Sequence, residues 1–214
     1  MRRRLAVVGG GGFGREILDI VDAINAAGRP GEGFDVMGVL DDGHPDGELL
    51  ASFEVPHLGP TAQMLELPAD VAVVVGIAHP QTRHRVVESM GVRERPILIH
   101  PTATMGRKVT LGPGAVVCSH VSVANHVVIG PDVQVGANST LGHDSTLGAC
   151  VTVSPLSAIS GDVHLEDRSF VGTGASINQG LRIGTDAVVG SGAAVVRDVD
   201  PKVTVVGNPA RVRP

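Results

Sequence analysis

The segment that decides the fold is STLGHDSTLGAC, residues 139–150, in which the letters STLG recur after six residues. The same spacing continues in both directions along the chain. An aliphatic residue occupies every sixth position from Met105 to Val195, sixteen positions without a break. The residue two places earlier is small or aliphatic each time, and glycine follows nine of the sixteen. Neither the 3.6-residue period of a helix nor the two-residue period of a flat strand keeps this register.

A six-residue repeat predicts a solenoid of short strands joined by sharp corners. Three hexads make one triangular coil of eighteen residues, so the sixteen hexads give a little over five coils. We expect the large aliphatic residue to point inward, a small residue to fit the narrow interior, and Gly or Ala to allow each corner.

The composition agrees with such a core. The chain has 214 residues with 29 Gly and 14 Pro, but no Trp, no Tyr and only four Phe. Its 35 valines can fill a narrow prism that needs no aromatic side chains. The net charge of −5 offers no basic excess to neutralise phosphates, so we expect no nucleic-acid partner.

The sequence also predicts where the protein works. The first apolar run, Leu5–Val8, is too short for an export signal or a membrane span. Two cysteines, Cys118 and Cys150, do not make a disulfide framework. We therefore expect a cytoplasmic protein that does not insert into a membrane.

The half of the chain before the repeat alternates predicted strands and helices, which indicates a small parallel sheet. The predicted strands are Leu5–Val8, Val36–Leu40 and Val71–Val75, the predicted helices are Arg15–Ala26 and Pro80–Met90, and Ile97–Ile99 closes the half. We expect an α/β domain over residues 1–98 and the solenoid, with a C-terminal tail, over residues 99–214.

Glycines connect the first predicted strand to the first predicted helix. Gly9, Gly11 and Gly14 form the pattern G-x-G-x-x-G of a Rossmann-like domain, which offers backbone N–H groups and a helix N-terminus to phosphates. A tight turn without a ligand is the alternative. Asp41 and Asp42 follow the second strand, where a carboxylate could accept hydrogen bonds from a ribose or a uracil N–H.

Arg83 begins the helix after the third strand. It is a further candidate for a phosphate contact, and a solvated helix arginine is the alternative.

His143 differs from the other eight histidines in its predicted surroundings. Stacking by eighteen residues puts Asn125 on one side of it and Gly161 on the other, so Gly161 leaves open surface beside the imidazole. The adjacent column runs through Asp144 and Asp162. A nearby carboxylate favours the imidazolium form and can fix the tautomer.

At this point the chain resembles a known family. The hexads resemble the left-handed parallel β-helix of hexapeptide-repeat acyltransferases. Four segments narrow the resemblance to bacterial nucleotide-aminosugar N-acetyltransferases and their sialic acid O-acetyltransferase relatives. In sequence order they are VVGGGGFGRE (7–16), LDD (40–42), the pair His143-Asp144, and VGNPAR (206–211).

The resemblance implies transfer of an acetyl group from acetyl-CoA to the amino group of a nucleotide-linked sugar, most simply a UDP-linked 4-amino sugar. It assigns His143 as the general base, which would take the proton of the attacking amine and later supply one to the thiolate. Asp144 would orient the ring, with Asp162 as the stacked alternative. A backbone N–H at a corner would stabilise the oxyanion, and no nucleophilic cysteine is needed.

The resemblance also implies the binding residues. Carried over by position, the acetyl-CoA contacts are Gly161, Thr173 and Ser191, on corners of successive coils. A second histidine of the family corresponds to Thr152 here. The nucleotide-sugar contacts would come from the glycine-rich turn and the residues that follow the next strands, namely Gly9, Gly11, Gly12, Phe13, Gly14, Asp41, Asp42 and Arg83.

Three other functions also fit parts of the sequence. A zinc carbonic anhydrase shares the prism and could use His120, His126 and His143, but Asn138 and Asp144 follow in those columns and no histidine column forms. We therefore expect no metal. A sugar O-acetyltransferase and a non-catalytic nucleotide-binding scaffold stay open as alternatives.

The assembly is predicted from the same prism. An open coil edge and flat apolar sides favour association, and the resembled family forms trimers with sites between neighbouring prisms. We expect a homotrimer in which His143 of one subunit meets coenzyme A lying against the next.

Overall fold

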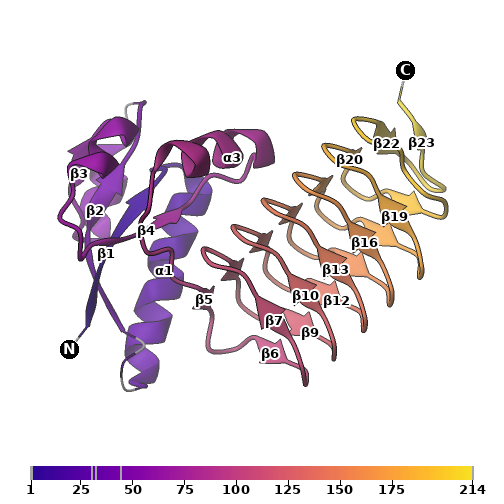
Figure 1. Cartoon of the computed structure of the whole chain (residues 1–214), viewed down its shortest axis with the longest axis horizontal. Coiled ribbons are helices and arrows are strands. Elements are labelled where there is room, and N and C mark those ends of the chain that lie inside the picture. Colours follow the sequence, from indigo (N-terminus) through magenta and orange to yellow (C-terminus); the bar gives the residue numbers. More distant parts are fainter. Residues whose placement is uncertain (1, 30, 32, 44, 214) are drawn as a thin grey trace.

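The computed structural model describes residues 2–29, 31, 33–43 and 45–213. The chain forms an α/β part at its N-terminal side and a long triangular prism that runs to its C-terminal side (Figure 1). The elements of the α/β part are β1 (Arg3–Val8), α1 (Gly12–Ala27), β2 (Phe34–Leu40), α2 (Gly47–Ser52), β3 (His57–Gly59), the 3-10 helix Thr61–Leu65, β4 (Ala72–Val75) and α3 (Pro80–Ser89).

The α/β part is a Rossmann-like parallel sheet with strand order β3-β2-β1-β4. The centre of the sheet is apolar and buried: Leu5–Val8 of β1 is completely buried, as is typical of a strand covered on both faces. Helix α1 turns Ile17, Val21 and Ile24 to the core, as the helical spacing predicts. The chain order reverses between β1 and β4, and ligands of such sheets bind at this switch point.

The predicted elements are present, with different ends. Helix α1 begins at Gly12 and not at Arg15, because the last glycines of the turn form its first helical residues. Elements α2, β3 and the 3-10 helix were not predicted, since each is only a few residues long.

The second part is a left-handed parallel β-helix built from the predicted hexads. Its strands lie in three parallel sheets in the described part of the chain, with orders β19-β16-β13-β10-β7, β23-β22-β20-β17-β14-β11-β8-β5 and β21-β18-β15-β12-β9-β6. From β5 to β21 each partner lies eighteen residues away, as in Thr140↔Ala158 and Leu141↔Ile159. The C-terminal tail adds an antiparallel strand, Val205↔Val212.

Each strand from β6 to β21 is two residues long and ends on the predicted aliphatic position. These strands and their neighbours are β5 (Leu98–Ile99), β6 (Thr104–Met105), β7 (Thr110–Leu111), β8 (Val116–Val117), β9 (Ser122–Val123), β10 (Val128–Ile129), β11 (Gln134–Val135), β12 (Thr140–Leu141), β13 (Thr146–Leu147), β14 (Thr152–Val153), β15 (Ala158–Ile159), β16 (His164–Leu165), β17 (Phe170–Val171), β18 (Ser176–Ile177), β19 (Arg182–Ile183), β20 (Val188–Val189), β21 (Ala194–Val195), β22 (Thr204–Val206) and β23 (Arg211–Val212).

The corners turn at a different residue from the one predicted. A positive φ recurs at every sixth position from Lys108 to Gly192, and most of these residues are not glycine. Asp, Asn and His tolerate this left-handed conformation better than most side chains do. Where a glycine follows the strand, it allows the next coil to approach closely. A Cβ on Gly142, for example, would overlap the backbone of Ser160 and Gly161 in the next coil.

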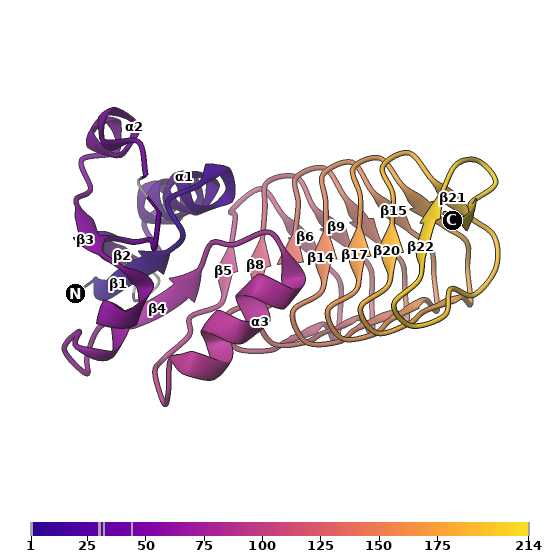
Figure 2. The same ribbon diagram turned by 90° about the horizontal axis from the view of Figure 1, so that it is seen from above.

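The two parts meet through β5 and α3. Strand β5 pairs with β8 through Leu98↔Val116, so it starts the β-helix and is not part of the first sheet. Helix α3 lies beside the first coils, as Figure 2 shows from above.

Candidate active site

His143 lies at the corner between β12 and β13, and a carboxylate holds its ring. Its Nδ1 lies 2.7 Å from Asp144 Oδ2, and both side chains are about half exposed. Asp144 has a positive φ of 62°, so it is the residue at which the corner turns. Because Nδ1 faces the carboxylate, Nε2 is the ring nitrogen left to exchange a proton with a substrate.

Gly161 packs against the other side of the ring. A Cβ on Gly161 would lie 2.5 Å from His143 Nε2 and 2.6 Å from Cε1, so only glycine lets the imidazole take this position. The backbone of Asp144 donates to Asn125 O at 3.1 Å, and the backbone of Asp162 donates to His143 O at 2.7 Å. The predicted stacking of Asn125, His143 and Gly161 is therefore present.

The two acidic neighbours of the corner differ in what they contact. The Asp144 carboxylate contacts the His143 ring and lies 3.9 Å from His126 Nδ1. The Asp162 carboxylate instead pairs with His164 at 3.5 Å. Asp144 is thus the carboxylate that orients the His143 ring in this structure.

Three residues predicted to contact acetyl-CoA lie on two edges of the prism. Thr173 and Ser191 are exposed and stack in one corner column, where Gly192 N donates to Thr173 O at 2.9 Å. Gly161 lies on the edge of the prism that carries His143. It is twelve residues from Thr173, which is two thirds of a coil and not a whole coil. One chain therefore does not present the three residues along a single edge.

The glycine-rich turn leaves the N-terminus of α1 open. Gly11 is its N-cap without a side-chain cap, and a Cβ on Gly11 or Gly12 would meet no atom within 4 Å. Gly9 has a φ of +107°, and a Cβ on Gly14 would overlap Gly9 O, so both positions need glycine. Unpaired N–H groups at such a helix end suit an anion. Phe13 is half-buried and packs against the core.

Asp41 and Asp42 lie beside this turn, where they bind the protein backbone. Asp41 accepts from Gly10 N at 2.6 Å and from Gly43 N at 2.7 Å. Asp42 accepts from Thr61 N at 2.7 Å.

Asp42 also lines a pocket of about 470 Å³. Thr61, Thr82 and Arg85 line the pocket too. Sequence reasoning missed these three residues, which carry no motif.

The structure corrects the role that the sequence predicts for Arg83. It is 1% exposed, and its guanidinium donates to backbone and side-chain oxygens of both parts of the chain. A guanidinium so enclosed is neither the predicted phosphate contact nor a solvated helix arginine. Burial lowers its pKa to about 10, so it stays charged at neutral pH.

Neither cysteine is activated as a nucleophile. Cys118 and Cys150 are buried free thiols, and burial raises their pKa to about 12 and about 11. Thiolate is the reactive form, so both side chains are inert packing groups near neutral pH. Thr152 is also buried, and its hydroxyl contacts Arg83 and Ala78 O, which occupies it inside the protein.

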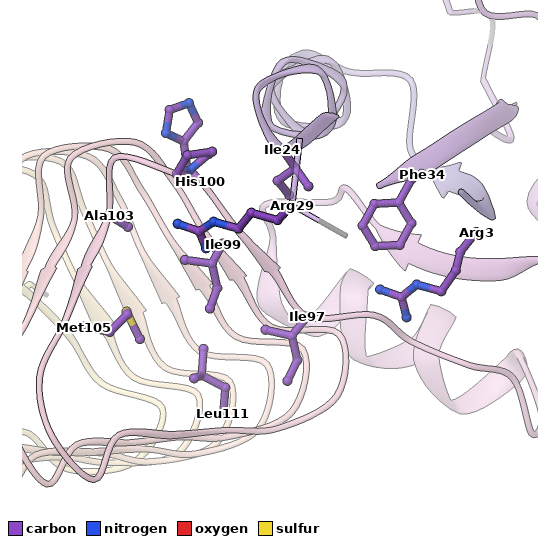
Figure 3. Close-up of a pocket in the computed structure, with 11 residues that line it drawn as sticks. Arg3, Ile24, Arg29, Phe34, Ile97, Ile99, His100, Ala103, Met105 and Leu111 are labelled. Atoms are coloured by element: carbon purple, nitrogen blue, oxygen red, sulfur yellow. The ribbon is translucent and has the colours of Figure 1, made fainter. Parts of the chain in front are cut away.

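A separate apolar pocket of about 510 Å³ lies where the first coil meets α1. Ile24, Phe34, Ile97 and Met105 line it, with Arg3 at its side (Figure 3). None of the predicted catalytic or binding residues lines this pocket, so volume alone does not identify the active site. Among the described residues, no helix is long and apolar enough to cross a membrane.

The chain is similar to known proteins over its whole length. Residues 4–90 match the family described as PglD N-terminal domain. The GDP-perosamine N-acetyltransferase of Escherichia coli O157:H7 is 34% identical over 215 residues, which cover 96% of this chain and 94% of the relative.

Solved structures give the same result. The acetyltransferase domain of PglB from Neisseria gonorrhoeae FA1090, in complex with acetyl coenzyme A, covers both chains completely with a TM-score of 0.87 and 29% identity. PerB from Caulobacter crescentus, in complex with CoA and GDP-perosamine, is 28% identical with a TM-score of 0.85 and covers 98% of this chain and 97% of its own. The chain therefore belongs to the hexapeptide-repeat family of nucleotide-sugar N-acetyltransferases, which are acetyl-CoA-dependent enzymes.

Proposed function

We propose that the protein transfers an acetyl group from acetyl-CoA to the amino group of a nucleotide-linked sugar, with His143 as the general base. The observation that carries this proposal is the contact of His143 Nδ1 with Asp144 Oδ2 at 2.7 Å, which leaves Nε2 next to Gly161. In this arrangement Nε2 takes the proton of the amine as nitrogen attacks the thioester carbon. The tetrahedral intermediate then expels the thiolate of coenzyme A, which receives a proton from the imidazolium.

Asp144 acts through the ring. Its carboxylate accepts a hydrogen bond from Nδ1–H, which fixes the tautomer and stabilises the imidazolium that forms during attack. A backbone N–H at the corner supplies the donor for the oxyanion.

The nucleotide half of the substrate binds to residues 1–98, and acetyl transfer takes place on residues 99–214. The open N-terminus of α1 with Gly9, Gly11, Gly12 and Gly14 supports a diphosphate site. Phe13 packs against the core and Asp41 accepts from Gly10 N, so both support this turn. Asp42 accepts from Thr61 N and lines the neighbouring pocket.

The base of the nucleotide has two candidates. The family resemblance favours a UDP-linked 4-amino sugar. A GDP-linked amino sugar is the second candidate, because the relative that matches 96% of this chain is a GDP-perosamine N-acetyltransferase. Both candidate substrates carry a diphosphate, which the glycine-rich turn would bind, and an amine, which would attack the thioester.

Acetyl-CoA would lie along the prism against Gly161, Thr173 and Ser191. These residues occupy two edges of one chain, and two neighbouring prisms in a homotrimer could bring them to one groove. Two free buried thiols fit a cytoplasmic setting for this reaction.

The test is thiol release from acetyl-CoA with UDP-, GDP- and dTDP-linked 4-amino sugars. Turnover with one sugar that falls roughly 10²–10⁴-fold in His143→Ala would support the reaction and the base. His164→Ala, which alters another half-exposed histidine of the same prism, is the matched control.

The other outcomes separate the alternatives. Turnover that survives His143→Ala would refute the catalytic assignment. No turnover across the panel, with nucleotide binding retained, would favour an O-acetyltransferase or a binding scaffold.

A further inference from the structure

We propose that Arg83 is a positioning residue, which fixes the nucleotide-binding turn at one orientation on the β-helix. The inference rests on the proposed function, because it concerns how a sugar bound to one part of the chain reaches the acetyl-transfer corner. Four observations carry it, and none of them involves His143 or its neighbours at the acetyl-transfer corner.

Arg83 joins the two parts of the chain with one side chain. Its Nη1 donates to Ile77 O at 2.6 Å and Ala78 O at 3.1 Å, which lie in the loop after β4. Its Nε donates to Asp132 O at 2.8 Å and its Nη2 to Cys150 O at 2.7 Å, which lie in successive coils of the β-helix. The guanidinium thus spans the junction from loop to prism.

Two uncharged side chains of the β-helix complete the junction. Gln134 accepts from Arg83 Nη1 at 2.9 Å and donates to Val75 O at 2.8 Å. Thr152 accepts from Arg83 Nη2 at 2.8 Å and donates to Ala78 O at 2.8 Å. Both side chains are buried, so their bonds with Arg83 lie inside the protein, whereas Ala78 itself is exposed.

The loop that Arg83 holds is in backbone contact with the nucleotide-binding turn. Gly76 N donates to Val8 O at 2.7 Å, and a Cβ on Gly76 would lie 2.7 Å from Gly14 Cα. A Cβ on Gly9 would lie 2.8 Å from Gly76 O. Because no side chain separates these glycines, the turn and the loop move together.

The acceptors of Arg83 require the shape of a guanidinium. The carboxylate of Asp132 pairs with Arg95, so Arg83 itself binds neutral oxygens that surround it in several directions. A guanidinium carries five donors in a fixed plane, whereas a lysine carries three on a compact ammonium. Arg83→Lys therefore keeps the charge and loses most of the junction.

This junction determines where a bound sugar points. The glycines of the turn keep their contacts with one another when Arg83 is lost, so nucleotide affinity persists. The orientation of the whole turn relative to the β-helix is then less defined, and the amine is misplaced with respect to His143. A misplacement of about 1 Å can lower a rate on the order of 100-fold.

The experiment compares Arg83→Lys and Thr152→Val with the wild type. Thr152→Val alters only the β-helix side of the junction and keeps the side-chain volume. Arg93→Lys is the matched control, because Arg93 also binds backbone carbonyls, those of Leu65, Leu67 and Pro68, all within the α/β part. The readouts are kcat at saturating substrates, KM for acetyl-CoA, nucleoside diphosphate affinity and Tm.

The proposal expects kcat to fall roughly 10- to 100-fold in Arg83→Lys and less in Thr152→Val, with nucleotide affinity and KM for acetyl-CoA little changed. Arg93→Lys should keep kcat. The proposal is overturned if both junction variants keep kcat, or if nucleotide affinity falls in parallel with kcat. If Arg83→Lys does not fold, Thr152→Val decides.

A second measurement separates this proposal from the proposed function. Spin labels on Val92→Cys and Val212→Cys, two exposed positions in the two parts, report the distance between them when labelled chains are diluted with unlabelled ones. A narrow distance distribution that broadens in Arg83→Lys supports the junction even if no sugar of the panel is turned over. An unchanged distribution overturns it even if the enzyme is active.

Discussion

His143 is held from two directions, by a carboxylate at Nδ1 and by a glycine next to Nε2. The two constraints do different things. Asp144 selects the tautomer, whereas Gly161 leaves the space in which the ring lies. Because both residues belong to corners of the same solenoid edge, one coil supplies the histidine and its carboxylate, and the next supplies the surface beneath them.

Gly161→Ala tests the second constraint. The added Cβ would lie 2.5 Å from Nε2, so the ring must tilt and the 2.7 Å contact with Asp144 must lengthen. We expect kcat at saturating acetyl-CoA and sugar to fall at least about 10-fold, with little change in Tm. Gly47→Ala, where a Cβ meets open space, is the control. A Gly161→Ala enzyme with wild-type kcat would show that the packing of the ring is unimportant.

For single residues, the sequence predicts contacts between residues at a fixed spacing. It does not predict contacts between residues without such a spacing. The contacts of His143 with its neighbours follow from the eighteen-residue coil. Arg83 has no such spacing, because its partners in the β-helix lie 49 to 69 residues away and most of them are backbone carbonyls. A carbonyl acceptor has no sequence signature, so burial of this arginine could not be foreseen.

The coils of the prism are joined at their corners as well as along their strands. Arg168 and Asp186 occupy the same corner in successive coils and form a bidentate pair, Nε to Oδ1 at 2.8 Å and Nη2 to Oδ2 at 3.2 Å. Both side chains are mostly buried, and the hydrogen bonds from Arg168 hold the pKa of Asp186 below its ordinary value of 3.8. Gln81 of α3 reaches the same carboxylate at 3.4 Å.

Asp186→Asn should lower the free energy of unfolding by roughly 1 kcal/mol at neutral pH. A carboxyl whose folded pKa is depressed stabilises the fold above its unfolded pKa, and this contribution is lost as the pH falls through the folded value. The difference between wild type and Asp186→Asn should therefore be constant from neutral pH down to about pH 5 and should shrink below about pH 4. Urea unfolding across this range measures it, with the exposed Asp200→Asn as control. A difference that grows on acidification would contradict the assignment.

The elements of the prism were predicted more exactly than those of the sheet, for a physical reason. Sixteen repeats of one pattern reinforce one another, so the position of every strand from β6 to β21 follows from the register. Short single elements such as α2 and β3 have no such repetition. The sequence wrongly predicts glycine as the turning residue of each corner. Glycine permits close approach of the coils, and the residue two places later turns the chain.

The whole molecule separates two tasks along its length. The α/β part presents an open helix end that suits a diphosphate, and the prism presents His143. Arg83 and its partners connect them. The residues predicted to contact coenzyme A lie on two different edges of one prism, since Gly161 and Thr173 do not share a column.

This division of edges leads to a prediction about mixed assemblies. If coenzyme A lies between prisms of a homotrimer, His143 of one chain works with Ser191 of its neighbour. His143→Ala and Ser191→Trp chains should then each be inactive alone and recover activity when they are co-expressed, because one interface of every mixed trimer keeps both residues intact. Random mixing of equal amounts predicts about one quarter of the wild-type kcat per chain. Sedimentation equilibrium, which should give three times the chain mass of 21.9 kDa, checks the assembly of each sample. Mixed trimers without any recovery would mean that each chain holds coenzyme A against its own His143, and a monomer would remove the shared site altogether.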